Sequence, residues 1–226
     1  MMGLADSVVD SSSHKKRYIV VEGPIGVGKT SLARRLASSF GSELILEDAG
    51  SNPFLERFYK SRGQGALPAQ LFFLFQRAQQ LLSLRQDDLF TPVTVSDFLI
   101  AKDRLFASMT LDKDELELYD QITEKLDIDP PLPDLVVYLQ APESILRQRI
   151  SGRGINYEQS INNRYLSDIN EAYARFFHDY HDAPLLIVNA AEIDPAHKDG
   201  DYGLLLERIL EVESGRHYFN PMPIAL

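Results

Sequence analysis

The chain has 226 residues, 44% of them hydrophobic and 25% charged, which is the composition of a globular domain with one sizeable core. Its formal net charge of −10 argues against a nucleic-acid-binding surface, which needs a dense basic stripe. The absence of cysteine excludes disulfides, thiolate metal sites and cysteine nucleophiles, and the five histidines show no zinc spacing.

The first 16 residues lack the apolar core of a secretion signal. They carry Asp6 and Asp10 and little arginine, which disfavours an organelle-targeting peptide. No apolar stretch approaches the roughly 20 residues that a membrane helix needs. We therefore expect a disordered leader over 1–16, a single domain over 17–226, no membrane partner, and a cytoplasmic location.

An apolar strand over 18–21 leads into the most specific pattern of the chain, Gly23-Pro24-Ile25-Gly26-Val27-Gly28-Lys29-Thr30. A strand, a glycine-rich turn and a helix start in this order indicate a P-loop, whose backbone N–H groups surround nucleotide phosphates. Lys29 is expected to reach the outer phosphates, and the Thr30 hydroxyl to ligate Mg²⁺. The alternative is a plain glycine turn with an exposed lysine, which the preceding strand disfavours. The predicted nucleotide-binding residues are Gly23, Gly26, Gly28, Lys29, Thr30 and Ser31.

Beyond the P-loop, hydrophobic periodicity and turn residues predict further elements. We expect helices over 31–40, 67–86, 102–109, 112–126, 144–149, 162–178 and 202–213, and another after Pro53. We expect strands over 43–46, 92–96, 135–139 and 185–188. With the strand before the P-loop, this alternation predicts an α/β fold in which helices cover both faces of a five-stranded parallel sheet. Two prolines exclude a helix interior over 218–223, to which we assign no element.

Two acidic residues, Glu47 and Asp97, follow strands at the sheet edge that carries the P-loop. Ligands of parallel sheets bind at this edge, where the strands have their carboxyl ends. An acid beside phosphates can hold Mg²⁺ or accept a proton from an attacking hydroxyl. A helix cap or a solvated charge is the alternative for each acid, but two at matching strand ends favour a phosphotransferase. Asp134 enters its strand from the opposite edge, so we expect it only to cap or to solubilise.

Several arginines surround the segment Ser151-Gly152-Arg153-Gly154, whose glycines are typical of a mobile flap. We expect Arg149 and Arg153 to stabilise the charge of a transferring phosphoryl group. For Arg147 we favour the plainer interpretation of an exposed basic residue at a helix end, where the helix dipole stabilises a cation.

Taken together, these segments resemble the deoxyribonucleoside kinase family over residues 17–188, with the strongest likeness to the bacterial deoxyguanosine and deoxyadenosine kinases. The resemblance implies a P-loop kinase fold with an arginine-bearing lid, and a homodimer formed through helices. Besides the P-loop, it is carried by Glu47 with Asn52-Pro53-Phe54-Leu55, Tyr59, Gln70 with Arg77, Asp97 with Asp103-Arg104, and Arg149-Ile150-Ser151-Gly152-Arg153 leading to Tyr157-Glu158-Gln159.

The resemblance implies a catalytic role for Glu47, which looks like the general base that takes the proton from the 5′-hydroxyl. Tyr59 and Glu158 look like the pair that holds the 3′-hydroxyl. Thr30 and Asp97 would hold Mg²⁺. The implied reaction is the ATP- and Mg²⁺-dependent phosphorylation of the 5′-hydroxyl of a deoxyribonucleoside.

The resemblance also implies how the base is read. Gln70 is similar to the glutamine that hydrogen-bonds the base edge, and Arg77 and Asp103 match the charged pair that members acting on purines or deoxycytidine place beside it. A purine is therefore favoured, and deoxycytidine stays open. For Gln70 and Arg77 the alternative is an outward polar face on a core helix.

The sequence departs from the family pattern at two positions. Most relatives carry an arginine directly after the acid of the third strand, where this chain has Phe98, and Ile155 replaces the second arginine of the flap. Both changes remove positive charge from the phosphate site, and Lys102 is a candidate to substitute in part.

Two other functions stay open on the sequence alone. One is a nucleoside monophosphate kinase, which needs arginines for the acceptor phosphate near the second strand, where only Arg57 and Arg62 are available. The other is a nucleotide-binding regulatory protein that has lost catalysis.

Overall fold

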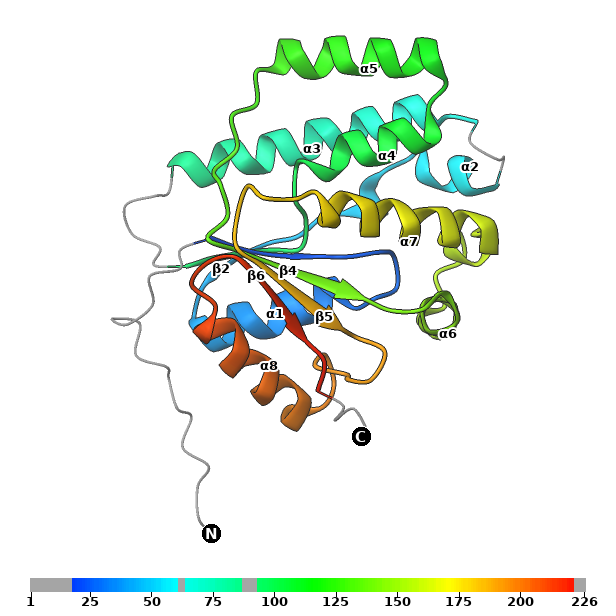
Figure 1. Cartoon of the computed structure of the whole chain (residues 1–226). Helices are drawn as coiled ribbons and strands as arrows, with labels where there is room; N and C mark the ends of the chain where they lie inside the picture. Colours follow the sequence, from blue (N-terminus) through cyan, green and yellow to red (C-terminus); the bar gives the residue numbers. More distant parts are fainter. Residues whose placement is uncertain (1–17, 61–63, 87–92, 222–226) are drawn as a thin grey trace.

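The computed structural model describes residues 18–60, 64–86 and 93–221, so the expected leader, Arg62 and Pro92 lie outside the described residues. The described residues form one parallel six-stranded sheet in the order β2-β3-β1-β4-β5-β6 (Figure 1). The strands are β1 (Tyr18–Glu22), β2 (Glu43–Ile45), β3 (Thr94–Ser96), β4 (Leu135–Gln140), β5 (Leu185–Asn189) and β6 (Arg216–Phe219). The helices are α1 (Lys29–Phe40), α2 (Leu55–Lys60), α3 (Ala66–Gln86), α4 (Lys102–Thr110), α5 (Lys113–Leu126), α6 (Glu143–Arg153), α7 (Asn163–His178) and α8 (Asp199–Glu211), with 3-10 turns η1 (Ala49–Ser51) and η2 (Glu158–Ser160).

The expected α/β architecture is confirmed, but the prediction of five strands is wrong. The sixth strand, β6, lies parallel to β5, with Arg216 paired to Leu185. It is an edge strand whose Tyr218 is 67% exposed, so its sequence lacks the apolar run of the buried strands. Part of the tail to which no element was assigned is therefore strand.

The helices agree with the expected ranges to within a few residues, with one informative exception. The segment interpreted as a glycine-flanked flap is the last turn of α6, which continues to Arg153. Gly154 ends the helix in the left-handed region, with φ 67°, and its N–H donates to the Ser151 carbonyl.

The central strands are buried and mostly apolar because helices cover both of their faces (Figure 1). In β1, Ile19 and Val21 pack in an aliphatic core with α1 and α8. The alternate residues Tyr18 and Val20 pack on the other face with aromatic side chains of α7, among them Phe177. α3, α4 and α5 form further layers beyond this face. None of the helices in the described ranges is both long and apolar enough to cross a membrane.

The order of the strands places the site. From β1 the chain runs to β2, at one edge of the sheet, and from β3 it crosses over β1 to β4, in the direction of the other edge. The connections thus diverge at the adjacent strands β1 and β3, whose carboxyl ends border a crevice. Val20 and Ile45 both pair with Ser96 of β3. The segments that follow β1, β2 and β3 therefore start side by side, and they carry the P-loop, Glu47 and Asp97.

Candidate active site

The P-loop is shaped by two glycines with different constraints. At Gly23, a Cβ atom would lie 2.5 Å from the Leu139 carbonyl oxygen of β4, so the loop passes too close to the sheet for any side chain. Gly28 precedes α1 with φ 106°, and no side chain caps this helix. The first N–H groups of α1 are therefore available for an anion.

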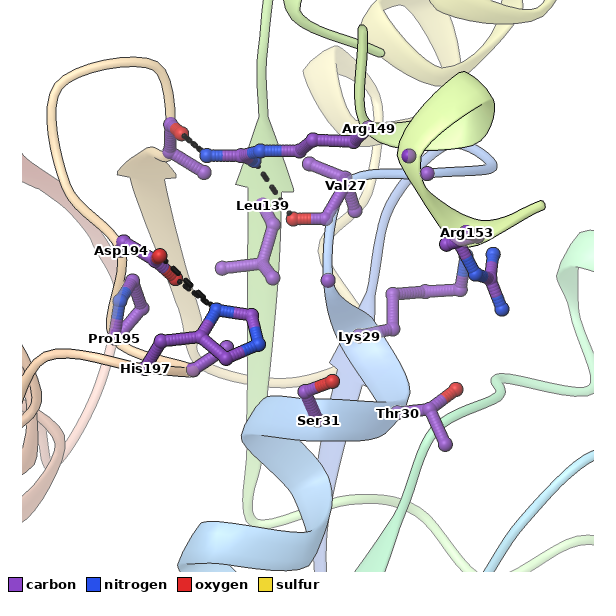
Figure 2. Close-up of a pocket in the computed structure, with 15 residues that line it drawn as sticks. Val27, Lys29, Thr30, Ser31, Leu139, Arg149, Arg153, Asp194, Pro195 and His197 are labelled. Atoms are coloured by element: carbon purple, nitrogen blue, oxygen red, sulfur yellow. Dashed lines mark hydrogen bonds and ion pairs between the residues drawn. The ribbon is translucent and has the colours of Figure 1, made fainter. Parts of the chain in front are cut away.

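A cavity of about 400 Å³ opens over this helix start (Figure 2). Five of the six predicted nucleotide-binding residues line it, and Gly23 does not, since it lies against β4. The five are Gly26, Gly28, Lys29, Thr30 and Ser31. The structure thus brings the motif residues together at a space suited to phosphates.

The opposite wall of this cavity comes from α6 and from the loop after β5. Arg149 donates to the carbonyls of Val27, at 3.1 Å, and Ala190, at 2.8 Å. It therefore joins the P-loop to the loop after β5. That loop brings His197, whose Nδ1 lies 3.0 Å from the Asp194 carboxylate. Sequence reasoning missed this loop, although its position after a parallel strand was a usable signal.

A second cavity of about 170 Å³ adjoins the first. Gly26, Lys29, Thr30 and Arg153 line both cavities. The predicted residues that line the second one are Glu47, Tyr59, Gln70, Arg77, Asp97 and Glu158. Asp103 is not part of its lining, but it forms an ion pair with Arg77.

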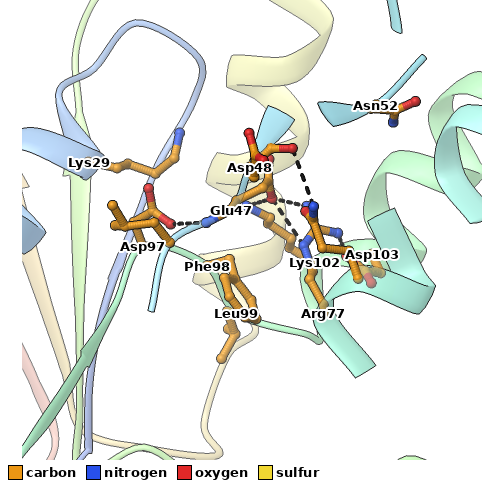
Figure 3. A network of polar contacts seen from close by, with 12 residues as sticks. Lys29, Glu47, Asp48, Asn52, Arg77, Asp97, Phe98, Leu99, Lys102 and Asp103 are labelled. Carbon is orange, nitrogen blue, oxygen red and sulfur yellow. Dashed lines mark hydrogen bonds and ion pairs between the residues drawn. The ribbon is translucent and has the colours of Figure 1, made fainter. Parts of the chain in front are cut away.

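Glu47 lies in a network of buried charges (Figure 3). Its Oε2 accepts hydrogen bonds from Nε, at 3.0 Å, and from Nη2 of Arg77, and the Lys102 ammonium lies 3.5 Å away. Burial alone would raise the pKa of Glu47, but the Arg77 and Lys102 cations outweigh it and lower the pKa to about 2. Glu47 is therefore a carboxylate at neutral pH.

Thr30 and Asp97 meet directly beside this network. The Thr30 hydroxyl donates to Oδ2 of Asp97 at 2.6 Å, and the Glu47 backbone N–H donates to Oδ1 at 2.8 Å. Burial raises the pKa of Asp97. A hydroxyl and a carboxylate beside a phosphate cavity fit Mg²⁺, which prefers oxygen ligands and is commonly held by one or two carboxylates plus phosphates.

The structure adds Glu22, which sequence reasoning did not select. This last residue of β1 is completely buried. Its carboxylate accepts the N–H of Gly23 at 2.8 Å, the N–H of Leu99 at 2.9 Å and the hydroxyl of Tyr173 at 3.0 Å. Lys102 forms an ion pair with it at 2.9 Å. An acid ending an otherwise apolar strand was the signal that could have identified it.

Gln70 and Arg77 face inward, with exposed fractions of 7% and 4%, so the alternative of an outward polar face is wrong. The hydroxyl of Thr110 donates to the Phe106 carbonyl at 2.7 Å, so it can only accept from Gln70, whose Nε2 lies 3.2 Å away. This hydrogen bond orients the Gln70 amide, so its Oε1 and its second N–H can face a nucleobase.

The lid side of the second cavity carries Glu158 and Tyr59. Glu158 is buried, which raises its pKa, and its Oε1 lies 3.5 Å from Arg153. Burial also raises the pKa of Tyr59, whose ring is parallel to that of Tyr157 at 6.1 Å between centroids. Tyr59 reaches the cavity from α2, and Glu158 reaches it from η2.

The residues for which we favoured plain structural roles have defined partners. Asp134 accepts the Tyr18 N–H at 2.8 Å, so its expected capping role is confirmed. Arg147 is more engaged than expected, because it donates to the Ile161 carbonyl and the Asn163 side chain. Arg57 lines neither of the two cavities.

Comparison with known proteins agrees with this arrangement. Residues 19–212 match the family model for deoxynucleoside kinases. The chain is 36% identical to deoxyguanosine kinase of Bacillus subtilis, over 69% of this chain and 76% of that protein. It is 29% identical to deoxyadenosine kinase of Lactobacillus acidophilus, over 79% of this chain and 87% of that protein.

Solved structures show the same fold. The deoxyadenosine kinase from M. mycoides with bound dATP superposes with a TM-score of 0.74 at 22% identity, covering 85% of this chain and 98% of that one. The family model spans most of the sequence, and the residues matched include every predicted site residue. The chain therefore belongs to the deoxynucleoside kinase family.

Proposed function

We propose that the protein transfers the terminal phosphoryl group of ATP to the 5′-hydroxyl of a deoxyribonucleoside, with purine deoxyribonucleosides preferred. The observation that carries the proposal is the meeting of two cavities at Lys29 and Thr30. The P-loop side suits the donor, and the Glu47 side suits the acceptor. A phosphoryl group held at this junction would have its leaving and attacking oxygens on opposite sides, as in-line transfer requires.

Glu47 is the proposed general base. Because it is ionised, it can accept the proton of the 5′-hydroxyl as that oxygen attacks phosphorus. Lys29 and Arg153 line the junction and would stabilise the phosphate charge. Arg149 is also expected to stabilise this charge, directly or through the P-loop backbone that it holds.

Thr30 and Asp97 would hold Mg²⁺, which when bound neutralises phosphate charge. On the acceptor side, Tyr59 and Glu158 would bind the 3′-hydroxyl. Gln70, with Arg77 supported by Asp103, would read the base. The relatives that are named deoxyguanosine and deoxyadenosine kinases support a purine.

A substrate panel tests this proposal. ADP release from ATP and Mg²⁺ would be measured with deoxyguanosine, deoxyadenosine, deoxycytidine, thymidine and each monophosphate, and the products identified. We expect turnover with a purine deoxyribonucleoside and a 5′-monophosphate product. Turnover with monophosphates alone would indicate a monophosphate kinase instead, and nucleotide binding without turnover would indicate a regulatory protein.

We also propose a homodimer in the cytoplasm. Support for the dimer comes from large exposed apolar side chains on two outer helices, Phe75 and Leu82 on α3 and Leu118 on α5. Light scattering at micromolar concentration would give twice the chain mass, and a monomer would contradict the proposal.

A further inference from the structure

The first residue of α4, Lys102, has an unusual position for a lysine. Its side chain is only 4% exposed, and its ammonium contacts two carboxylates, one at the end of β1 and one in the segment after β2. Figure 3 shows Lys102 beside the second of these, Glu47. Glu22 Oε1 is 2.9 Å away, and Glu47 Oε2 is 3.5 Å away. Lys102 also lines the acceptor cavity. Buried lysines are rare because their desolvation is costly, so this one is expected to have a specific partner or role.

The charges around Lys102 show what its ammonium does. Glu22 is immobilised by two backbone N–H groups and a tyrosine hydroxyl, all of which hold its negative charge at the end of β1. Without Lys102, this buried carboxylate and Glu47 would lack the cation that lies between them. Arg77 contacts Glu47 as well, but it is also paired with Asp103. Lys102 therefore links the proposed base to the strand that precedes the P-loop.

The residue that directly follows Asp97 brings no charge to Glu47. The ring of Phe98 is completely buried in an apolar cluster with Ile45 and Leu81, so position 98 serves the core. Lys102, four residues later, brings a positive charge to Glu47 instead.

We propose that Lys102, together with Arg77, positions Glu47: its ammonium ties the carboxylate to Glu22 and so aims it at the acceptor hydroxyl. This inference rests on the proposed function. It predicts an effect on kcat that acts through Glu47.

The cysteine-free sequence permits a direct test of the charge. Lys102→Cys would introduce a single thiol, to be alkylated in denaturant before refolding. With 2-bromoethylamine the sulfur displaces bromide and regains an ammonium at lysine length. With 1-bromopropane it gains a chain of the same length without charge. Lys113→Cys, at an exposed position on α5, would be treated in the same way as a control.

We expect the propylated enzyme and Lys102→Met to lose about 100-fold in kcat, with KM for ATP changed by less than about threefold, since a misplaced catalytic group costs this much. The aminoethylated enzyme should regain most of the rate. In the Glu47→Gln background, Lys102→Met should cost little more, because the two residues act as a unit. Every form of the Lys113→Cys control should match the unmodified enzyme.

Three results would overturn the proposal. Equal kcat for the propylated and aminoethylated forms would show that only packing matters. Refolding of the charged form alone would show that the ammonium serves the fold. Full additivity with Glu47→Gln would show that Lys102 acts independently of the base. An unmodified enzyme without turnover on any deoxyribonucleoside would instead reject the proposed function, so the two failures are distinct.

Discussion

The two cavities that meet at Lys29 are built in opposite ways. The donor side consists largely of backbone: glycines, the uncapped start of α1 and carbonyls held by Arg149. The acceptor side consists of buried charged and polar side chains drawn from β1, α3, α4 and the segments after β2 and β3. A site built from backbone groups is lost when the path of the chain changes. A network of charged side chains instead loses its function when any one of its members is replaced. Substitutions on the donor side should therefore act mainly through folding, whereas those on the acceptor side should change the rate of the reaction and the pH dependence of stability.

Glu47→Gln should have the largest effect on catalysis, and it should leave ATP binding intact. The amide cannot accept the proton, so we expect kcat to fall by about 1000-fold. ATP affinity, measured by equilibrium binding, should stay unchanged because Glu47 does not line the donor cavity. Glu56→Gln, at an exposed position on α2, is the control. Near-normal turnover of Glu47→Gln would remove Glu47 from its assigned role.

Gly23→Ala should damage the donor side through the backbone. Its φ of 148° and the Leu139 carbonyl 2.5 Å from the added Cβ leave no room, so we expect the free energy of unfolding to fall by about 3 kcal/mol. Gly203→Ala in α8 meets nothing within 4 Å and should raise it by about 0.5 kcal/mol. Chemical denaturation measures both, and equal stabilities would contradict the close approach.

The acceptor-side charges predict how stability depends on pH. The pKa of Glu47 in the folded protein, about 2, lies below its unfolded value of about 4.3. Its contribution is therefore complete above the unfolded pKa and is lost as pH falls toward 2. Between pH 5 and pH 3 the unmodified protein should lose about 1.5 kcal/mol more unfolding free energy than Glu47→Gln. Parallel pH profiles of the two proteins would show that the pair with Arg77 does not hold in solution.

Thr110→Val should have the smallest effect, confined to acceptor binding. It removes the hydroxyl that orients Gln70, and we expect kcat/KM for the deoxyribonucleoside to fall about fivefold while KM for ATP is unchanged. Thr123→Val on α5 is a matched control, because its hydroxyl makes the same bond to the carbonyl four residues earlier, at 2.9 Å, in a helix that lines neither cavity. A similar loss in both variants would assign the effect to the helix bond.

The same contrast explains what could be predicted from sequence. The P-loop is a local pattern, so its residues and their place after β1 followed directly from residues 18–31. Glu47 and Asp97 followed from a general rule about strand ends. Glu22 and the contact between Lys102 and Glu47 depend on how β1, β2 and α4 pack, which no local pattern contains. The strand β6 was missed because it contains no buried apolar run. It is a strand because its backbone pairs with β5.

The attachment of α6 has a mechanical consequence. Arg149 ties one side of this helix to Val27 and Ala190, and Arg147 ties it to Ile161 and Asn163. Arg153, the last residue of the same helix, lines both cavities. Because of these bonds, α6 cannot tilt alone. A tilt that brings Arg153 toward a phosphate would also displace the P-loop, the loop after β5 and the residues at the start of α7. The donor cavity and the acceptor cavity would then narrow together.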